Sequence, residues 1–280
     1  MPDKQVTQHF VIGSMPKISL LAGACVKYAA SWRVISINLV ILHLRYALSG
    51  ASTYYFTTYF LRKRNKMQRI ELHNILPKVF ADTQITASDV WLTEFAFEKG
   101  EHYMVKAESG TGKSSLCSYI YGYRTDYSGQ ITFDGADIAP LNAERWSQIR
   151  RTEIAYLPQE MRLFPELTAL ENVQLKNQLT SHCSEREILD MFATLGISDK
   201  VDTPVQRLSI GQQQRVAIIR TLCQPCDFIV LDEPVSHLDL TNNQIVARLI
   251  ESHAERIGAG IIATSVGNNL CLNRIKELTL

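Results

Sequence analysis

The chain contains a short run of glycine and hydroxyl residues, followed by a lysine, that could bind phosphate. The run reads AESGTGKSS and occupies residues 107–115. Backbone N–H groups of such a loop can surround phosphate oxygens, and the amine of Lys113 can reach the outer ones. The hydroxyl of Ser114 is then placed to ligate Mg²⁺. Gly110 and Gly112 lie where the backbone must come closest to phosphate, so this spacing predicts a nucleotide site.

Two acidic residues follow a strongly apolar run far downstream of this loop. Asp232 and Glu233 close the run FIVLDEP, which reads as a buried strand. An acid at this position, paired with a phosphate loop, is typical of the Mg²⁺ site of enzymes that cleave nucleoside triphosphates. Glu233 is placed to accept a proton from an attacking water. Two solvated acids at a strand end would be common without the loop, and the combination therefore favours nucleotide hydrolysis.

The elements that must position these groups read as an α/β core. HYMVKAE is a short strand that runs into the loop, and KSSLCSYIYGY reads as a helix after it, as phosphate binding at a helix N-terminus requires. The apolar runs DFIVLDEP and GAGIIATS read as buried parallel strands. Helices between parallel strands indicate an open, layered sheet with its ligands at the carboxyl ends of the strands.

Other stretches predict a further β region and a helical region. IELHNI alternates as a strand with Asn74 on its apolar face, VWLTEFAF reads as a second strand, and GQITFDGADI closes a hairpin at its Asp-Gly pair. NAERWSQIRRTEIAYLPQ reads as a helix followed by a strand. Residues 165–207 are expected to be mostly helical, with Ser184 as the N-cap and Gly196 as the C-cap of one helix.

Charge divides the chain near residue 66. Residues 1–66 contain nine Lys or Arg and one acid, Asp3, whereas residues 67–280 hold the other 20 Lys or Arg and 27 Asp or Glu. The formal net charge of +1 gives no reason to expect a nucleic-acid partner. Within residues 1–66 the longest uncharged stretch, 46–61, has 16 residues, which is short of the roughly 20 apolar residues of a membrane helix. Residues 1–66 are therefore interpreted as upstream sequence before a native start at Met67, or as a weakly membrane-associated extension.

Four further stretches give the sequence a family resemblance. LSIGQQQR at 208–215 is similar to the LSGGQ signature of ABC ATPases, YLPQE supplies Gln159 at the Q-loop position, and SHLD at 236–239 looks like the D-loop. LFPELTALENV at 163–173 resembles the same stretch in small cassettes of the lipoprotein-release, macrolide-efflux and cell-division type. The sequence thus resembles the ATP-binding cassette (ABC) family over essentially all of 67–280.

The resemblance implies a P-loop NTPase cassette: an α/β fold with a mostly parallel sheet core, an antiparallel β region and a helical subdomain at about 160–207. It also implies that ATP is held between two cassettes, by the phosphate loop of one and the signature of the other. Phe80 is the candidate to stack on adenine, and Gln159 joins Ser114 and Asp232 as a Mg²⁺ ligand. The implied nucleotide-binding set is Phe80, Ser109, Gly110, Thr111, Gly112, Lys113, Ser114, Ser115, Ser209, Gly211 and Gln212.

The function that the resemblance implies is that of the ATP-binding and ATP-hydrolysing subunit of an ABC transporter. Such a subunit dimerises on ATP, as a homodimer or paired cassette, and drives a separate membrane permease. It is peripheral, at the cytoplasmic face of the inner (plasma) membrane. Phe164 and Leu167 are candidates to receive the permease, although apolar residues at helical spacing are also expected in the core of the helical subdomain.

The sequence departs from the family at three positions. Ala107 begins the loop in place of glycine, and Ile210 replaces the first signature glycine. Ser265 stands where the family has a histidine that contacts the γ-phosphate, and it is grouped with Glu233 and Gln159 as catalytic. A hydroxyl carries no positive charge, and losing a transition-state contact of this kind costs on the order of 10²–10³ in rate. The alternative function is therefore an ATP-binding dimerisation switch with slow hydrolysis that regulates a membrane or cytosolic partner.

Overall fold

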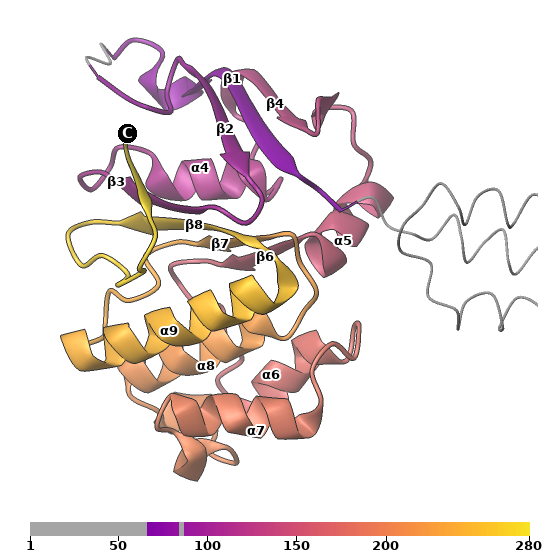
Figure 1. Cartoon of the computed structure of the whole chain (residues 1–280), viewed down its shortest axis with the longest axis vertical. Coiled ribbons are helices and arrows are strands. Elements are labelled where there is room, and N and C mark those ends of the chain that lie inside the picture. The colour runs from indigo at the N-terminus through magenta and orange to yellow at the C-terminus, as the bar shows by residue number, and fades with distance from the viewer. Residues whose placement is uncertain (1–65, 84–86) are drawn as a thin grey trace, which may run out of the picture. The chain divides into compact units, whose positions relative to one another are not determined.

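The computed structural model describes residues 66–83 and 87–280, which form two β-sheets with helices packed against them (Figure 1). One sheet has the strand order β2-β1-β4-β5, and its pairings are antiparallel. The other has the order β6-β7-β8-β3-β9, and its pairings are parallel. The predicted α/β fold, with a parallel core and an antiparallel β region, is confirmed.

The bounds of the elements agree with most of the predicted segments. The strands are β1 Arg69–Pro77, β2 Glu94–Glu98, β3 His102–Lys106, β4 Tyr127–Phe133, β5 Ala136–Asp137, β6 Ile154–Leu157, β7 Phe228–Leu231, β8 Gly260–Ser265 and β9 Lys276–Thr279. The α-helices are α4 Lys113–Ile120, α5 Ala143–Thr152, α6 Ala169–Asn177, α7 Glu185–Thr194, α8 Ile210–Leu222 and α9 Leu240–Ile257. Short 3₁₀ helices are η1 Lys78–Phe80, η2 Ser198–Lys200 and η3 Val205–Arg207.

Alternate residues of the parallel strands pack into two separate apolar layers. In β7, Ile229 and Leu231 pack with residues of helices α6 to α9, whereas Phe228 and Val230 pack with residues of α4 and the antiparallel sheet. Figure 1 shows helices α6 to α9 on one face of the parallel sheet, and α4 on the other face beneath the antiparallel sheet. Successive side chains of a strand point to opposite faces, so a strand covered on both faces must be apolar throughout. This explains the unbroken run FIVL.

The parallel register brings the functional segments to one edge of the sheet. Lys106 at the end of β3 pairs with Ser265 at the end of β8, and Leu157 at the end of β6 pairs with Leu231 at the end of β7. The phosphate loop, the acids after β7 and the segment after β6 therefore all leave the sheet at its carboxyl edge, where open α/β sheets bind their ligands.

Strand β1 departs from the predicted alternation at Asn74. This residue is exposed with a φ of +51°, and the register with β4 shifts between His73 and Leu76. The prediction that Asn74 continues the apolar face is wrong, because a bulge turns it outward and puts Ile75 in the core. Gly129 on β4 accommodates the bulge, since a Cβ at this position would lie 2.4 Å from the carbonyl oxygen of Asn74.

The predicted hairpin and helix caps follow from local sequence. Asp134 and Gly135 both have positive φ, at +50° and +77°, as a two-residue turn between β4 and β5 requires. Ser184 caps the N-terminus of α7 with a complete capping box, as predicted. The C-cap of this helix is Leu195, one residue earlier than predicted, and Gly196 follows it with a φ of +65°.

The helices of residues 66–83 and 87–280 include none that is both long enough and apolar enough to cross a bilayer. The predictions made for residues 1–66, upstream sequence or a membrane-associated extension, concern a segment that lies outside the described residues except for Lys66. The helical region expected at about 160–207 is built from α6, α7, η2 and η3.

Candidate nucleotide-binding site

The phosphate loop joins the end of β3 to the start of α4. Gly110 and Gly112 have φ values of +85° and +100°, which side chains disfavour, and Gly112 is the N-cap of α4. Ala107 is not among the described residues with positive φ, and its N–H donates to the carbonyl of Ser265 over 3.3 Å. Alanine is therefore accommodated at the first position of the loop without backbone strain.

The amine of Lys113 is folded back into this loop. Lys113 is only 4% exposed, and its Nζ donates to the carbonyls of Ala107 at 3.1 Å and Glu108 at 2.6 Å. Burial lowers the pKa of Lys113, and the nearby carboxylates of Glu233 and Asp232 act in the opposite direction. The buried ammonium of Lys113 donates to two neutral carbonyl oxygens. A phosphate oxygen would bind it more strongly, because hydrogen bonds between charged groups are the stronger ones.

The structure brings Asp232 to the same place as Ser114. Asp232 is 2% exposed, and its Oδ1 accepts a hydrogen bond from the Thr264 hydroxyl over 2.8 Å. Burial raises the pKa of Asp232, while hydrogen bonds from Ser114 and Thr264 lower it. A buried carboxylate beside a hydroxyl offers the hard oxygen ligands that Mg²⁺ prefers, so these residues fit the predicted metal.

Glu233 and Gln159 meet although they follow different strands. The Nε2 of Gln159 donates to Oε2 of Glu233 over 3.2 Å. The backbone of Glu233 has a φ of +50°, which is uncommon for a residue with a side chain, and its N–H donates to the Thr264 hydroxyl over 3.1 Å. Thr264 thus holds both acids at once, and the sequence analysis missed it. The one signal was a hydroxyl residue at the end of the predicted strand GAGIIATS.

Ser265 lies at the end of β8, next to the start of the loop. It is 2% exposed, and its hydroxyl has no hydrogen-bond partner among residues 66–83 and 87–280. A buried hydroxyl without a partner is rare and costly. Its backbone carbonyl accepts a hydrogen bond from the N–H of Ala107, so Ser265 lies beside the start of the loop.

Phe80 packs against the loop from the side of η1. A Cβ on Gly112 would lie 3.0 Å from Cε2 of Phe80 and 3.1 Å from Cζ2 of Trp91, so both rings line the loop. Trp91 also donates from Nε1 to the carbonyl of Thr111 over 3.2 Å. Trp91 precedes β2, in a turn where a strand was predicted for the whole of VWLTEFAF, and the sequence analysis gave it no role.

The other predicted loop residues differ in their contacts. Ser109 is exposed, and the hydroxyl of Thr111 donates to the carbonyl of Glu108 over 2.8 Å. The hydroxyl of Ser115 accepts a hydrogen bond from Arg124 over 2.8 Å. Ser109 is therefore open to a ligand, whereas Thr111 and Ser115 are already engaged within the chain.

The signature residues lie at the N-terminus of α8. Ser209 is the N-cap: its hydroxyl accepts from the N–H of Gln212 over 3.3 Å, and Gln212 Oε1 accepts from the N–H of Ser209 over 2.9 Å. Gly211 packs closely, since a Cβ there would lie 3.1 Å from the carbonyl oxygen of His237. Ile210 is 48% exposed. Helix α8 belongs to the helical layer, on the opposite face of the parallel sheet from α4 (Figure 1).

The fold and these groups together define a phosphate-loop nucleotide-binding domain with acids at the carboxyl edge of a parallel sheet. The family model described as ABC transporter matches residues 92–236, and the chain belongs to this family.

Several relatives are similar over most of their length. The chain is 27% identical over 206 residues to the lipoprotein-releasing system ATP-binding protein LolD of Shewanella frigidimarina, covering 72% of this chain and 86% of the relative. It is 35% identical over 156 residues to the ABC transporter ATP-binding protein YtrE of Bacillus subtilis, covering 55% and 68%. A solved structure, the dimeric structure of the bacterial ABC transporter cassette MJ0796, matches with a TM-score of 0.63 and 26% identity, covering 75% of this chain and 94% of that one.

Proposed function

We propose that this chain is the ATP-binding and ATP-hydrolysing subunit of an ABC transporter, which dimerises on ATP and drives a separate membrane permease. The observation that carries the proposal is the meeting of the buried Lys113 and Asp232 with the half-buried Glu233 at one edge of the parallel sheet. Family membership and the ATP-binding relatives support it.

We assign the roles of the loop residues from their contacts. The N–H groups of the loop and the amine of Lys113 bind the phosphates, because the glycines have the backbone conformation that opens such a loop. Ser114, Asp232 and Gln159 would hold Mg²⁺, which neutralises charge on the phosphates when bound. Phe80 provides a ring beside Gly112 on which adenine can stack.

Glu233 is assigned as the base that takes a proton from the attacking water. Two neighbours orient it: the Thr264 hydroxyl accepts its backbone N–H, and Gln159 donates to its carboxylate. Ser265 is assigned as the donor that a triphosphate would meet beside the loop, since its buried hydroxyl lacks a partner within the described residues.

A complete ATP site is proposed to need two chains. Ser209, Gly211 and Gln212 cap a helix whose N-terminal N–H groups and dipole favour an anion. Two chains in head-to-tail contact would bring this helix end to the phosphate loop of the partner. A solved relative is titled a dimeric structure of a post-hydrolysis state bound to ADP and Pi. Binding to a permease would place the dimer at the cytoplasmic face of the inner membrane.

A second candidate function is an ATP-dependent dimerisation switch with slow hydrolysis. The observation that favours it is Ser265, since serine brings one neutral donor to a position where the family has an imidazole. Both functions share ATP binding and dimerisation, and they differ in turnover.

The test is phosphate release by the full chain, alone and with its permease, for the wild type and Glu233→Gln. We expect Glu233→Gln to lower kcat by about 10²–10³, as for loss of a general base, with ATP binding retained. Glu166→Gln, which alters an exposed acid in the segment before α6, is the matched control and should turn over like the wild type. Unchanged hydrolysis by Glu233→Gln would remove the assigned base, and ATP binding without turnover in the wild type would favour the switch.

A further inference from the structure

The indole of Trp91 is a buried ring that contacts the phosphate loop directly. Trp91 is 2% exposed, and its Nε1 donates to the carbonyl oxygen of Thr111 over 3.2 Å. Its Cζ2 would lie 3.1 Å from a Cβ on Gly112, so the ring also packs against the next residue of the loop. A hydrogen bond and a packing contact thus meet on the peptide that joins Thr111 to Gly112. The roles assigned above to the loop residues make no use of this ring.

The hydrogen bond from Trp91 fixes the direction of this peptide. The peptide between Thr111 and Gly112 is trans, and in a trans peptide the carbonyl oxygen and the following N–H point to opposite sides. Because the carbonyl of Thr111 points to Trp91, the N–H of Gly112 points away from it. Trp91 belongs to the apolar layer that also contains residues of α4 and the antiparallel sheet. The N–H of Gly112 is therefore directed away from this layer.

The other N–H groups of the loop are open to an incoming acceptor as well. Within the part of the chain that the structure describes, no N–H of residues 108–112 donates to a backbone carbonyl. A run of backbone N–H groups that point into one concave loop makes a binding site for an anion. The N–H of Gly112 belongs to this run only while the carbonyl of Thr111 stays on the side of Trp91.

Glycine at position 112 makes the opposite orientation of the peptide accessible. A rotation of the peptide by about 180° takes the φ of Gly112 from +100° to about −80°, and glycine adopts both values readily. The rotated peptide places the carbonyl oxygen of Thr111 where the N–H of Gly112 was. A carbonyl oxygen is an acceptor and repels phosphate oxygens. The glycine that the loop requires therefore also permits a form of the loop that binds phosphate poorly.

The backbone around Trp91 is itself held by hydrogen bonds. The hydroxyl of Ser88 accepts from the N–H of Val90 over 3.1 Å and from the N–H of Trp91 over 2.7 Å. The N–H of Leu92 donates to the carbonyl of Ile75 on β1 over 3.0 Å. The indole is therefore carried by a turn that is tied to the antiparallel sheet, and it can hold the loop against that sheet.

We propose that Trp91 is a positioning residue, which holds the peptide between Thr111 and Gly112 with its N–H directed to bound phosphate. Without the indole N–H, this peptide rotates for part of the time. The rotated fraction weakens the apparent affinity for a triphosphate, whereas every loop that has bound ATP is in the correct form. Trp91 therefore acts on affinity and leaves the turnover of bound ATP unchanged. The inference rests on the proposed function, because the peptide has a phosphate to meet only if the loop binds nucleotide.

The test measures equilibrium binding of ATP with Mg²⁺ and of inorganic triphosphate to the full chain, together with phosphate release. Trp91→Phe removes the indole N–H and one of the two rings. Replacement of Trp91 by benzothienylalanine, an isostere with sulfur in place of the indole N–H, removes the donor and keeps the packing. This second variant decides the question should Trp91→Phe fail to fold. Trp146→Phe is the matched control, since its ring packs on Gly122, which follows the other end of α4.

We expect both Trp91 variants to raise the Kd for ATP and for triphosphate by about three- to tenfold, as for loss of one neutral hydrogen bond. Their kcat at saturating ATP should stay within about twofold of the wild type, and Trp146→Phe should bind and turn over like the wild type. A merely structural Trp91 would lower stability in urea and leave both Kd values unchanged, which overturns the proposal. A fall in kcat as large as the loss of affinity also overturns it.

The same measurements separate this proposal from the proposed function. If the wild type binds ATP without turnover and the Trp91 variants bind it more weakly, the hydrolytic function is removed and the role of Trp91 is retained. If the wild type hydrolyses ATP and the variants bind it equally well, the function is retained and the role of Trp91 is overturned. A wild type that binds neither ATP nor triphosphate overturns both.

Discussion

Thr264→Val is the substitution that most directly removes the hydrogen bonds that hold Asp232 and Glu233 in place. Thr264 is 1% exposed, and its single hydroxyl donates to Asp232 over 2.8 Å and accepts from the backbone of Glu233 over 3.1 Å. Valine keeps the shape of threonine and removes both hydrogen bonds. The backbone of Glu233, at a φ of +50°, then loses the contact that holds it in an unfavourable conformation.

The magnitude follows from the two lost bonds. A hydrogen bond to a charged group contributes about 1.5–3 kcal/mol, and a buried N–H left without a partner costs about 1–3 kcal/mol. Because water can reach part of the site, we expect Thr264→Val to lower the free energy of unfolding by about 2–4 kcal/mol. The displaced Glu233 should also lower kcat by about tenfold or more, as for a misplaced catalytic group.

The assay is urea unfolding followed by circular dichroism, together with phosphate release by the same samples. Thr264→Ser is the matched control: it keeps the hydroxyl, loses one methyl group and should cost only about 1 kcal/mol, with kcat preserved. A free energy of unfolding for Thr264→Val within 0.5 kcal/mol (roughly the scatter of surface substitutions) of the wild type would refute the reasoning. So would a Thr264→Ser variant as inactive as Thr264→Val.

Three further predictions test other contacts. Gly112→Ala should abolish ATP binding, because φ is +100° and its Cβ would lie 3.0 Å from Phe80; equilibrium binding of labelled ATP measures this. Ser265→Ala should raise the free energy of unfolding by about 1 kcal/mol, because it removes a buried hydroxyl that has no hydrogen-bond partner within the described residues. The same substitution should lower kcat. Urea unfolding and phosphate release measure the two effects. Lys176 binds a proton less tightly in the folded than in the unfolded chain, its pKa being lowered from 10.5 to about 8. Stability relative to Lys176→Met should therefore increase by about 1–2 kcal/mol from about pH 7 to about pH 9.5, and equal pH profiles would contradict it.

The sequence predicted the parts of the site that depend on short local patterns. Lys113 and the glycines sit in one continuous loop, and Asp232 and Glu233 end an apolar strand. The residue types and their spacing in the sequence were therefore enough to predict where these residues lie in the fold. The capping box at Ser184 is local in the same way.

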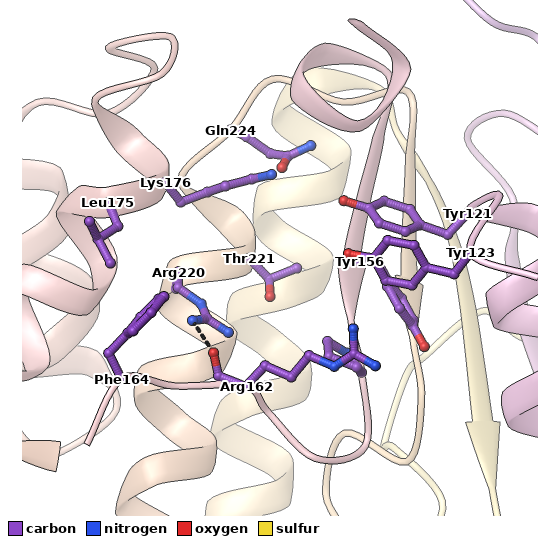
Figure 2. A pocket seen from close by; sticks show the side chains of 11 residues that line it. Tyr121, Tyr123, Tyr156, Arg162, Phe164, Leu175, Lys176, Arg220, Thr221 and Gln224 are labelled. Carbon is purple, nitrogen blue, oxygen red and sulfur yellow. Dashed lines mark hydrogen bonds between the residues drawn. The ribbon is translucent and has the colours of Figure 1, made fainter. Parts of the chain in front are cut away.

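The missed features depend on pairing between distant segments. Thr264 acquires its role only because β8 lies beside β7, and Trp91 only because the turn before β2 packs on the loop. The bulge at Asn74 is set by the pairing of β1 with β4, which propensity does not encode. Lys176 of α6 and Arg220 of α8 line one cavity (Figure 2), and because they come from two helices no single stretch of sequence displays this cluster.

The side chains of β7 point alternately into two apolar layers, and this affects which substitutions the chain can accumulate during evolution. Ile229 and Leu231 face the helical layer, and Phe228 and Val230 face the layer that supports the phosphate loop. Substitutions on the two faces share few neighbours, so their effects on stability should add. The helical layer can thus accept substitutions while the layer around the phosphate loop stays under its own separate constraints.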